Sequence, residues 1–347
     1  MDTLGKVGFA CKYMCKDQTQ KKKLLEEIQR PYNCRSTTVR WLNEQSRDVA
    51  EERLFDIAMH NVSSFGKLID YVSGLPIRQR MVRLGSDVLP AFTEPSWSYF
   101  WRQDSVQRTI KNKLAVIGER ARASGVRLSM HPGQFTVLAS DRDDVVERSI
   151  EEFEYHVCIA KWMGYAQQFQ DFKINVHISG RKGAQGIKDA LPRLSPEARK
   201  TITIENDEMS WGIDESLKLE KDLALVLDIH HHWVRTGEYI QPTDDRFKRI
   251  VDSWRGVQPV IHYSVSREDL LVDHDINTLP NMEALLAQGY KKQKLRAHSD
   301  YMWNTAVNDW ASSFRPYADI MVESKMKNLA SLPFEESYTA KYEDLYQ

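Results

Sequence analysis

The stretch Leu225-Val-Leu-Asp-Ile-His-His-His232 decides the fold. Apolar residues of strand character run from Ala224 to Leu227, and they end in Asp228 and three consecutive histidines. A buried strand that ends in Asp and His brings oxygen and nitrogen donors to one place, and such donors suit Mn, Zn, Co or Fe. A His-rich surface loop is the alternative, and this stretch by itself does not separate the two. The other strands of the chain decide between them.

Short apolar runs that end in polar residues recur along the whole chain. We expect strands at 7–11, 81–84, 126–130, 173–178, 201–204, 223–229, 260–265 and 319–322. Amphipathic segments with helical spacing lie between them. We expect these helices at 38–72, 106–123, 144–163, 184–200, 214–222, 247–254, 282–288 and 301–313. Asp143 or Asp144 is the expected N-cap of the third helix.

Strands that alternate with helices predict a parallel sheet in an α/β fold. Polar residues end nearly every strand. This favours a closed barrel, whose active site is the ring of C-terminal strand ends, over an open sheet with one switch point. We therefore predict a single-domain (β/α)8 TIM barrel over residues 1–325. A closing helix and tail are expected at 326–347.

Length and composition limit the classes of protein. The 347 residues are 41% hydrophobic and 28% charged, which predicts a globular chain with a substantial core. The sequence has no run of about 18 apolar residues, so we expect no membrane-spanning helix and no interaction with a membrane. The N-terminus lacks the pattern of a secretory signal, and the four cysteines form no CxxC pair. Both features predict a cytoplasmic, intracellular location with reduced thiols.

The net charge of −1 excludes a polycation, so a nucleic-acid surface must be local. Residues 12–40 hold eight basic side chains against three acidic ones. A second basic cluster occupies 291–296. Charge alone favours a solvated surface for both segments, and a phosphate-binding surface is the alternative.

Strand alternation predicts that polar residues from many strands share one central volume. Residues two apart on a strand lie on the same face, so the inward faces would bring six donors together. These donors are His131, His177, Glu205, Asp228, His262 and Glu323. Any one of them alone is more often a hydrogen-bonded structural group. Three buried carboxylates together would be costly without cations between them, so we predict two or three ions with bridging carboxylates.

The motifs at these strand ends resemble those of the UV damage endonucleases. The matching stretches are 7–11 (VGFAC), 83–90 (RLGSDVLP), 127–135 (RLSMHPGQF), 204–207 (IEND), 228–231 (DIHH), 261–264 (IHYS), 298–300 (HSD) and 321–325 (MVESK). They follow the family's order over nearly the whole chain. The resemblance implies a divalent-metal TIM barrel that acts on double-stranded DNA. It would nick immediately 5′ to cyclobutane pyrimidine dimers and 6-4 photoproducts, and also at abasic sites. No protein partner is inferred.

The same resemblance implies a set of metal ligands. These are His131, His177, Glu205, Asp228, His231, His262, His298 and Glu323. The Asp-x-x-His match selects His231 among the three neighbouring histidines, and His298 enters only through the match. Glu205, His131 and His262 are the predicted catalytic residues. Manganese is the favoured ion, with Zn, Co and Mg as alternatives.

Four residues are predicted to contact the substrate. Gln134 and Phe135 would enter the duplex at the lesion, where stacking an aromatic ring offsets part of the cost of unstacking. Phe9 is expected to line the same pocket. At 9 and 135 the family usually has Tyr, so Phe keeps the stacking and loses a hydroxyl. Lys12 is expected among the basic residues that bind phosphate.

Two positions depart from the family pattern. Where the family usually has a histidine before a proline, this chain has Glu94, and we hypothesise that Glu94 supplies a carboxylate near a third ion. A weakened third site is the rival reading. Where the family often has Lys-x-His on the seventh strand, this chain has Val260 before His262.

Three other functions remain open on the sequence. One is an abasic-site endonuclease without preference for photoproducts. Another is a metal-dependent sugar isomerase or epimerase, which would need a small closed pocket, two ions at most and no basic surface. The third is a damage-binding barrel with a degraded site.

Overall fold

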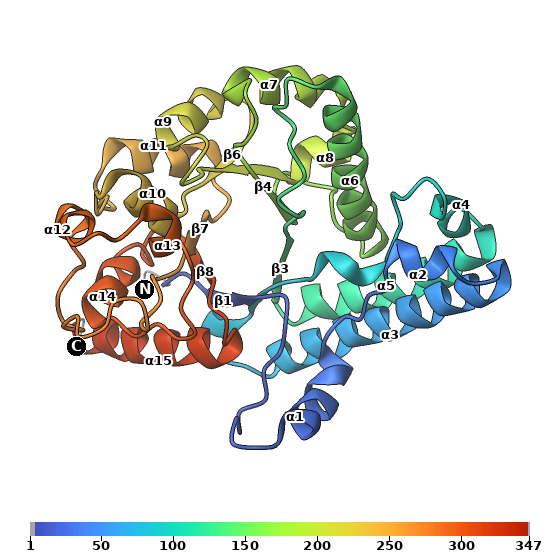
Figure 1. Ribbon diagram of the computed structural model, residues 1–347, viewed down its shortest axis with the longest axis horizontal. Helices are drawn as coiled ribbons and strands as arrows, with labels where there is room; N and C mark the ends of the chain where they lie inside the picture. Colours follow the sequence, from blue (N-terminus) through green and yellow to red (C-terminus); the bar gives the residue numbers. More distant parts are fainter. Residues whose placement is uncertain (1–3, 346–347) are drawn as a thin grey trace.

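The computed structural model describes residues 4–345, and in this part of the chain eight parallel strands form a barrel with helices around it (Figure 1). All of the predicted strands are present, most of them one or two residues shorter than expected. Their bounds are β1 Val7–Ala10, β2 Met81–Arg83, β3 Arg127–Met130, β4 Lys173–His177, β5 Ile202–Glu205, β6 Ala224–Val226, β7 Val260–Tyr263 and β8 Asp319–Val322. The TIM-barrel prediction is confirmed.

The helices cover the outside of the barrel (Figure 1). They are α1 Lys22–Gln29, α2 Val39–Asn43, α3 Arg47–Ser73, α4 Ser98–Trp101, α5 Asp104–Ala123, α6 Asp143–Trp162, α7 Gly183–Ala190, α8 Pro196–Thr201, α9 Ile213–Ser216, α10 Ile229–Thr236, α11 Asp245–Ser253, α12 Met282–Ala287, α13 Lys292–Leu295, α14 Thr305–Ser312 and α15 Asn328–Leu345. No helix within residues 4–345 is long and apolar enough to cross a membrane.

Several helix boundaries differ from the sequence prediction. The segment 38–72 is two helices, because α2 ends at Asn43 and α3 begins only at Arg47. The N-cap prediction for α6 was wrong: Arg142 is at the N-cap, and Asp143 and Asp144 lie in the first turn. Carboxylates there are stabilised by the positive end of the helix dipole without capping it.

The barrel closes between β6 and β7. The hydrogen-bonded order is β6-β5-β4-β3-β2-β1-β8-β7, and an isolated parallel bridge joins Asp228 to His262. The backbone N–H of His262 donates to Leu227 at 2.9 Å across this seam. Two predicted metal ligands therefore face each other where the barrel closes.

Side chains alternate between two environments along each strand. Outward residues such as Leu128, Ile204 and Ile261 are buried in the core beneath the helices. The inward residues toward the N-terminal ends of the strands form a small apolar cluster that includes Met81 and Val260. The inward residues at the C-terminal ends are polar, and they form the mouth of the barrel.

The chain returns to the barrel after β8. Helix α15 packs beside β1, and its Phe334 lies against Tyr263 with ring centroids 5.4 Å apart. A helix after residue 325 was expected. The division of the chain at residue 325 stays a prediction.

Candidate metal centre

Three overlapping groups of metal donors lie at the mouth of the barrel. Among the described residues these groups are His131, His177 and Glu205; His177, Glu208 and His231; and Glu205, Asp228 and His262. Within each group one donor atom from every residue lies within 4.8 Å of the others. The groups share members, so the side chains form one continuous cluster.

Glu205 is at the centre of this cluster. Its Oε2 lies 3.6 Å from His131 Nε2, 3.8 Å from His177 Nε2 and 3.1 Å from His262 Nδ1. Its Oε1 lies 3.4 Å from His231 Nδ1. Burial alone would raise the pKa of Glu205, but His262 and His177 hold it well below its ordinary value. The carboxylate is therefore charged and able to bridge two cations.

Three buried atoms of the cluster lack hydrogen-bond partners in the described chain. They are Glu205 Oε1, Asp228 Oδ2 and His262 Nδ1. The 3.1 Å approach of His262 to Glu205 does not have hydrogen-bond geometry. Buried polar atoms without partners are rare because each loses its hydration. A divalent cation would satisfy all three, so the residues present fit a metal.

The local fold after β6 explains which histidine joins the cluster. Asp228 is the N-cap of α10, and its Oδ1 accepts a 2.7 Å hydrogen bond from the backbone N–H of His231. This turn brings His231 Nε2 to 3.6 Å from Asp228 Oδ2. His230 instead stacks on Trp233, and His232 is paired with Glu238 at 2.9 Å. The structure therefore places His231 in the cluster.

The pKa shifts of this pair reflect the concentration of charge. Burial raises the pKa of Asp228 well above its ordinary value. Burial alone would lower the pKa of His231, but Asp228 and Glu205 raise it to about 10. Burial thus disfavours the charged form of Asp228, whereas the neighbouring carboxylates favour the charged form of His231.

Glu323 and His298 lie at the edge of the cluster. Glu323 is ion-paired with Arg83, and its carboxylate lies 3.4 Å from His262 Nδ1 and 3.9 Å from His298 Nδ1. Burial alone would raise the pKa of Glu323, but Arg83 and His262 hold it well below its ordinary value. Both predicted ligands are therefore adjacent to the centre, although neither belongs to the three groups.

The sequence did not single out four residues that shape the centre. Glu208 is in the second donor group. Asn175 donates to Glu205 Oε2 and accepts from Thr203 Oγ1 at 2.8 Å. Arg83 and Lys173 contact Glu323 and His262 respectively. Strand alternation could have found Lys173 and Asn175, because both share the inward face of β4 with His177.

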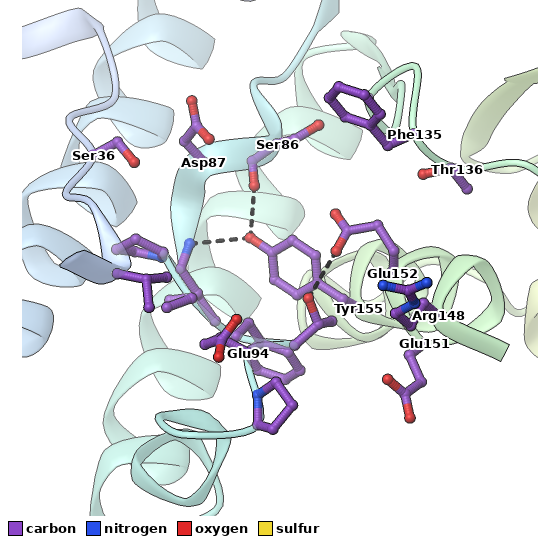
Figure 2. A pocket seen from close by; sticks show the side chains of 18 of the residues that line it. Ser36, Ser86, Asp87, Glu94, Phe135, Thr136, Arg148, Glu151, Glu152 and Tyr155 are labelled. Carbon is purple, nitrogen blue, oxygen red and sulfur yellow. Dashed lines mark hydrogen bonds between the residues drawn. The ribbon is translucent and has the colours of Figure 1, made fainter. Parts of the chain in front are cut away.

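The predicted DNA probes lie at the tip of the loop after β3. Gln134 is exposed. Phe135 is 84% exposed, which is unusual for a large aromatic side chain, and it lines the pocket drawn in Figure 2. The base of the loop is fixed because Ser86 Oγ donates to the carbonyl of His131 at 2.9 Å. Lys12 is exposed in the loop after β1.

Two predicted site residues lie outside the cluster of metal donors. Phe9 faces outward from β1 and is fully buried in the core beneath the helices, because the inward positions of β1 are Gly8 and Ala10. Glu94 lines a pocket of about 740 Å³ together with Glu152 and with Phe135 of the loop after β3 (Figure 2). The structure brings neither residue into the three donor groups.

The comparisons with known proteins agree with this fold. The family described as UV-endonuclease UvdE matches residues 5–344. A UV-damage endonuclease from Schizosaccharomyces pombe is 27% identical over 341 residues, which are 94% of this chain and 49% of that protein. A UV DNA damage endonuclease from Bacillus cereus strain Q1 is 25% identical over 312 residues, 86% of each chain.

The chain therefore spans about half the length of the yeast relative and most of the bacterial one. A crystal structure of SacUVDE superposes with a TM-score of 0.71 at 20% identity, covering 97% of this chain and 99% of that one. That likeness supports the barrel fold. From the match over residues 5–344, the chain belongs to the UV-endonuclease UvdE family.

Proposed function

We propose that this chain is a metal-dependent DNA repair endonuclease that makes one nick immediately 5′ to UV photoproducts. Cyclobutane pyrimidine dimers and 6-4 photoproducts are the proposed substrates, with abasic sites as a further class. The observation that carries the proposal is the buried cluster of unpartnered donors at Glu205, Asp228 and His262, in a chain of the UV-endonuclease family.

The proposed centre holds two or three divalent ions, with manganese favoured. His131, His177 and Glu205 would hold one ion, and Glu205, Asp228 and His262 another. His177, Glu208 and His231 would hold a third. When bound, such ions supply Lewis acidity toward a phosphate ester and toward an attacking water. The chain itself keeps the donors in place.

Several residues of the chain hold the donors in position. Asn175 fixes Glu205 by donating to Oε2, and Arg83 fixes Glu323 by an ion pair. Ser86 ties the loop that carries His131 to the end of β2. With these contacts the donors are positioned before DNA arrives, so little reorganisation is needed at the chemical step.

Two basic regions are proposed to grip DNA phosphates. Helix α1 and the loop before it project from the barrel, and α1 has no buried residue (Figure 1). At the mouth, Arg296 lies 3.1 Å from Glu208, so the 291–296 segment borders the donor cluster. Phosphate contacts of this kind fix the register of a duplex on the protein and make binding salt-dependent.

Lesion recognition is proposed to use the exposed loop tip. A damaged dinucleotide is easier to unstack than a sound one. Gln134 and Phe135 would occupy the space it leaves, with the Phe135 ring stacked on the neighbouring base. The 84% exposure of that ring supports a role in binding, because burying it on DNA would recover its hydrophobic contribution.

A nicking assay tests the proposal. Duplexes with one cyclobutane dimer, one abasic site or no lesion are incubated with the chain and Mn²⁺, and the products are mapped on a sequencing gel. We expect one cut directly 5′ to the dimer, none in the undamaged duplex and none after EDTA. An uncut dimer duplex would overturn the proposal, and cutting only at the abasic site would favour an abasic-site endonuclease.

A further inference from the structure

Three aromatic side chains are exposed among the described residues. They are Phe135 (84%), Tyr317 (47%) and Tyr301 (44%). Phe135 has a proposed role in lesion recognition, and Tyr317 lies just before β8, at the N-terminal end of the barrel. Tyr301 lies at the mouth, as its neighbours in the chain show, and the proposed function gives it no role. Tyrosine is enriched among the residues that dominate binding surfaces, so its place at the mouth needs an explanation.

The segment before Tyr301 is held against the ends of two barrel strands. The backbone N–H of Ser299 donates to the carbonyl of Val265, just after β7, at 3.0 Å. The Ser299 carbonyl accepts from the backbone N–H of Lys325, just after β8, at 3.0 Å. Asp300 is also paired with Lys325 Nζ at 3.2 Å. Tyr301 therefore lies on the rim of the mouth, beside β7 and β8.

The segment after Tyr301 is also held by hydrogen bonds. The carbonyl of Met302 accepts from Asn308 Nδ2 at 2.8 Å, and Trp303 Nε1 donates to the carbonyl of Ser266 at 2.8 Å. Contacts on both sides restrict the backbone at Tyr301, so little conformational entropy is lost when a ligand contacts its side chain. An exposed side chain on a restrained backbone is preorganised for binding.

Tyr301 and Phe135 lie on opposite sides of the donor cluster. Around the closed barrel β3 and β7 are four strands apart in both directions (Figure 1). Phe135 follows β3, and Tyr301 is held beside the end of β7. The metal donors occupy the mouth between these two rims. A duplex with one phosphate at the donors would therefore extend over both rims.

The hydroxyl of Tyr301 is available to a ligand. In the part of the chain that the structure describes it makes no hydrogen bond, whereas the buried hydroxyls of Tyr155 and Tyr263 donate to Ser86 O at 2.7 Å and to Asn308 Oδ1 at 2.6 Å. A tyrosine hydroxyl can donate to a phosphate oxygen of DNA. In intact duplex the base faces are stacked on one another, so a residue at the rim can reach the phosphates and sugars.

We propose that Tyr301 is a second DNA-contacting residue, whose hydroxyl donates to a backbone phosphate of intact duplex beside the lesion and whose ring packs on the adjoining sugar. The contact differs from that of Phe135, which has no hydroxyl and stacks where bases are unstacked. The inference deepens the proposed function and rests on it, because it assigns a further substrate contact at the same mouth.

Hydroxyl-radical footprinting of wild type tests the contact without any substitution. The chain is oxidised with and without an undamaged duplex, and the oxidation of each side chain is read by mass spectrometry. The duplex should slow the oxidation of Tyr301 and leave that of Tyr317 unchanged. Tyr317 is the matched control because it is similarly exposed at the other end of the barrel. Equal oxidation of Tyr301 with and without duplex would overturn the proposal.

Two substitutions separate the hydroxyl from the ring. Tyr301→Phe should weaken duplex binding by about 2- to 10-fold, which is the usual net contribution of one hydrogen bond. Tyr301→Ala should weaken it further, because the packing of the ring is lost as well. Fluorescence anisotropy measures both, and Tyr317→Ala should bind as wild type does. Wild-type affinity in Tyr301→Phe would overturn the phosphate contact, and wild-type affinity in both variants would overturn the whole assignment.

The choice of duplex and the salt dependence sharpen the assignment. The loss should be the same for undamaged and dimer-containing duplex, because Tyr301 contacts intact backbone; a loss confined to damaged DNA would overturn that. A neutral donor releases no counterion, so Tyr301→Phe should keep the salt slope of wild type. Lys294→Met, in the basic 291–296 segment, should instead reduce the slope by about one. A reduced slope in Tyr301→Phe would contradict a neutral donor.

The failure of this inference is distinct from that of the proposed function. If wild type binds duplex but cuts no dimer-containing DNA, the nuclease proposal fails while the footprint still decides the role of Tyr301. If wild type nicks at dimers and Tyr301 is not protected, only the contact at Tyr301 is wrong. A chain that binds no duplex would overturn both.

Discussion

The two ends of the barrel both carry buried charged groups, but these groups have all their partners at one end and lack some at the other. At the N-terminal end, Arg127 pairs with Asp319 at 2.7 Å, and Asp319 also accepts from the backbone N–H of Lys6 at 2.7 Å. At the mouth, Glu205, Asp228 and His262 each retain a buried atom without a hydrogen-bond partner. The first arrangement is complete within the chain, whereas the second has atoms left over that a cation would satisfy.

This difference separates buried charges that folding alone explains from buried charges that need a further partner. A buried charge with its partners in place is explained by folding alone. A group of buried donors with atoms left over carries a cost that folding does not recover. Substitutions at the N-terminal end should therefore change stability, and substitutions at the mouth should change metal binding and catalysis.

The largest expected effect is at the centre of the cluster. Glu205→Gln removes the bridging charge, so we expect nicking to fall at least about 10³-fold, equivalent to about 4 kcal/mol of transition-state stabilisation. Initial rates on a dimer-containing duplex measure this, with circular dichroism to show that the fold is kept. Nicking within tenfold of wild type would mean that Glu205 is not a bridging ligand.

The converse change breaks the ion pair at the other end. Arg127→Met leaves the buried Asp319 without its cationic partner, so we expect the free energy of unfolding to fall by about 3 kcal/mol. Urea unfolding followed by tryptophan fluorescence measures the change. Metal affinity should equal that of wild type, and a loss of Mn²⁺ binding in this variant would erase the distinction between the two ends.

A smaller effect is expected at the tip of the mouth. Phe135→Ala should weaken binding to dimer-containing DNA by about 2 kcal/mol, because an aromatic ring stacked on a base contributes about 1–3 kcal/mol. Fluorescence anisotropy at fixed salt measures it. Phe135→Tyr is the control and should bind at least as well as wild type. An equal loss of affinity for undamaged duplex would assign Phe135 to general DNA binding.

The smallest expected effect is on the pH dependence of stability, and it follows from a comparison of two buried histidines. Burial lowers the pKa of both His156 and His262 to about 4. His156 Nδ1 donates to Glu152 O at 2.7 Å and its Nε2 lies 2.9 Å from Ser86 Oγ, whereas His262 Nδ1 has no hydrogen-bond partner among the described residues. In the unfolded chain His156 takes up a proton near pH 6.5, whereas in the folded chain it does so only near pH 4. The free energy of unfolding therefore falls as the pH drops from 6.5 toward 4.

At pH 5.5 this linkage from His156 is worth about 1 kcal/mol relative to pH 7. His156→Gln keeps hydrogen-bonding capacity and removes the titration, so its stability should fall less between pH 7 and 5.5 than that of wild type. Urea unfolding in EDTA measures both chains without metal effects. Identical pH slopes would show that His156 is not held neutral.

The sequence predicted the barrel because each strand is a short apolar run with a polar end, which is a local signal. The same alternation predicted the convergence of His131, His177, Glu205, Asp228 and His262. It did not predict the break before α3 or the place of Glu94, since both depend on loop geometry. Phe9 was assigned from resemblance, and the inward Gly8 and Ala10 show why it faces outward.

The residues that support the ligands were the hardest to predict. Lys173 and His262 are 89 positions apart, and only the closed barrel brings them together. Glu208 follows a recognised motif, but its role depends on the turn after β5 and on its distance of 3.6 Å to His231. Contacts across a barrel leave no periodic signal in a single sequence.

The metal centre is tested most directly by the number of Mn²⁺ ions bound per chain at equilibrium. Metal-free wild type, Glu205→Gln and Arg127→Met are dialysed against Mn²⁺ and analysed by elemental mass spectrometry. The donor groups predict two or three ions in wild type and in Arg127→Met, and fewer in Glu205→Gln. No bound ion in wild type, or the same number in Glu205→Gln, would contradict a metal centre at the mouth of the barrel.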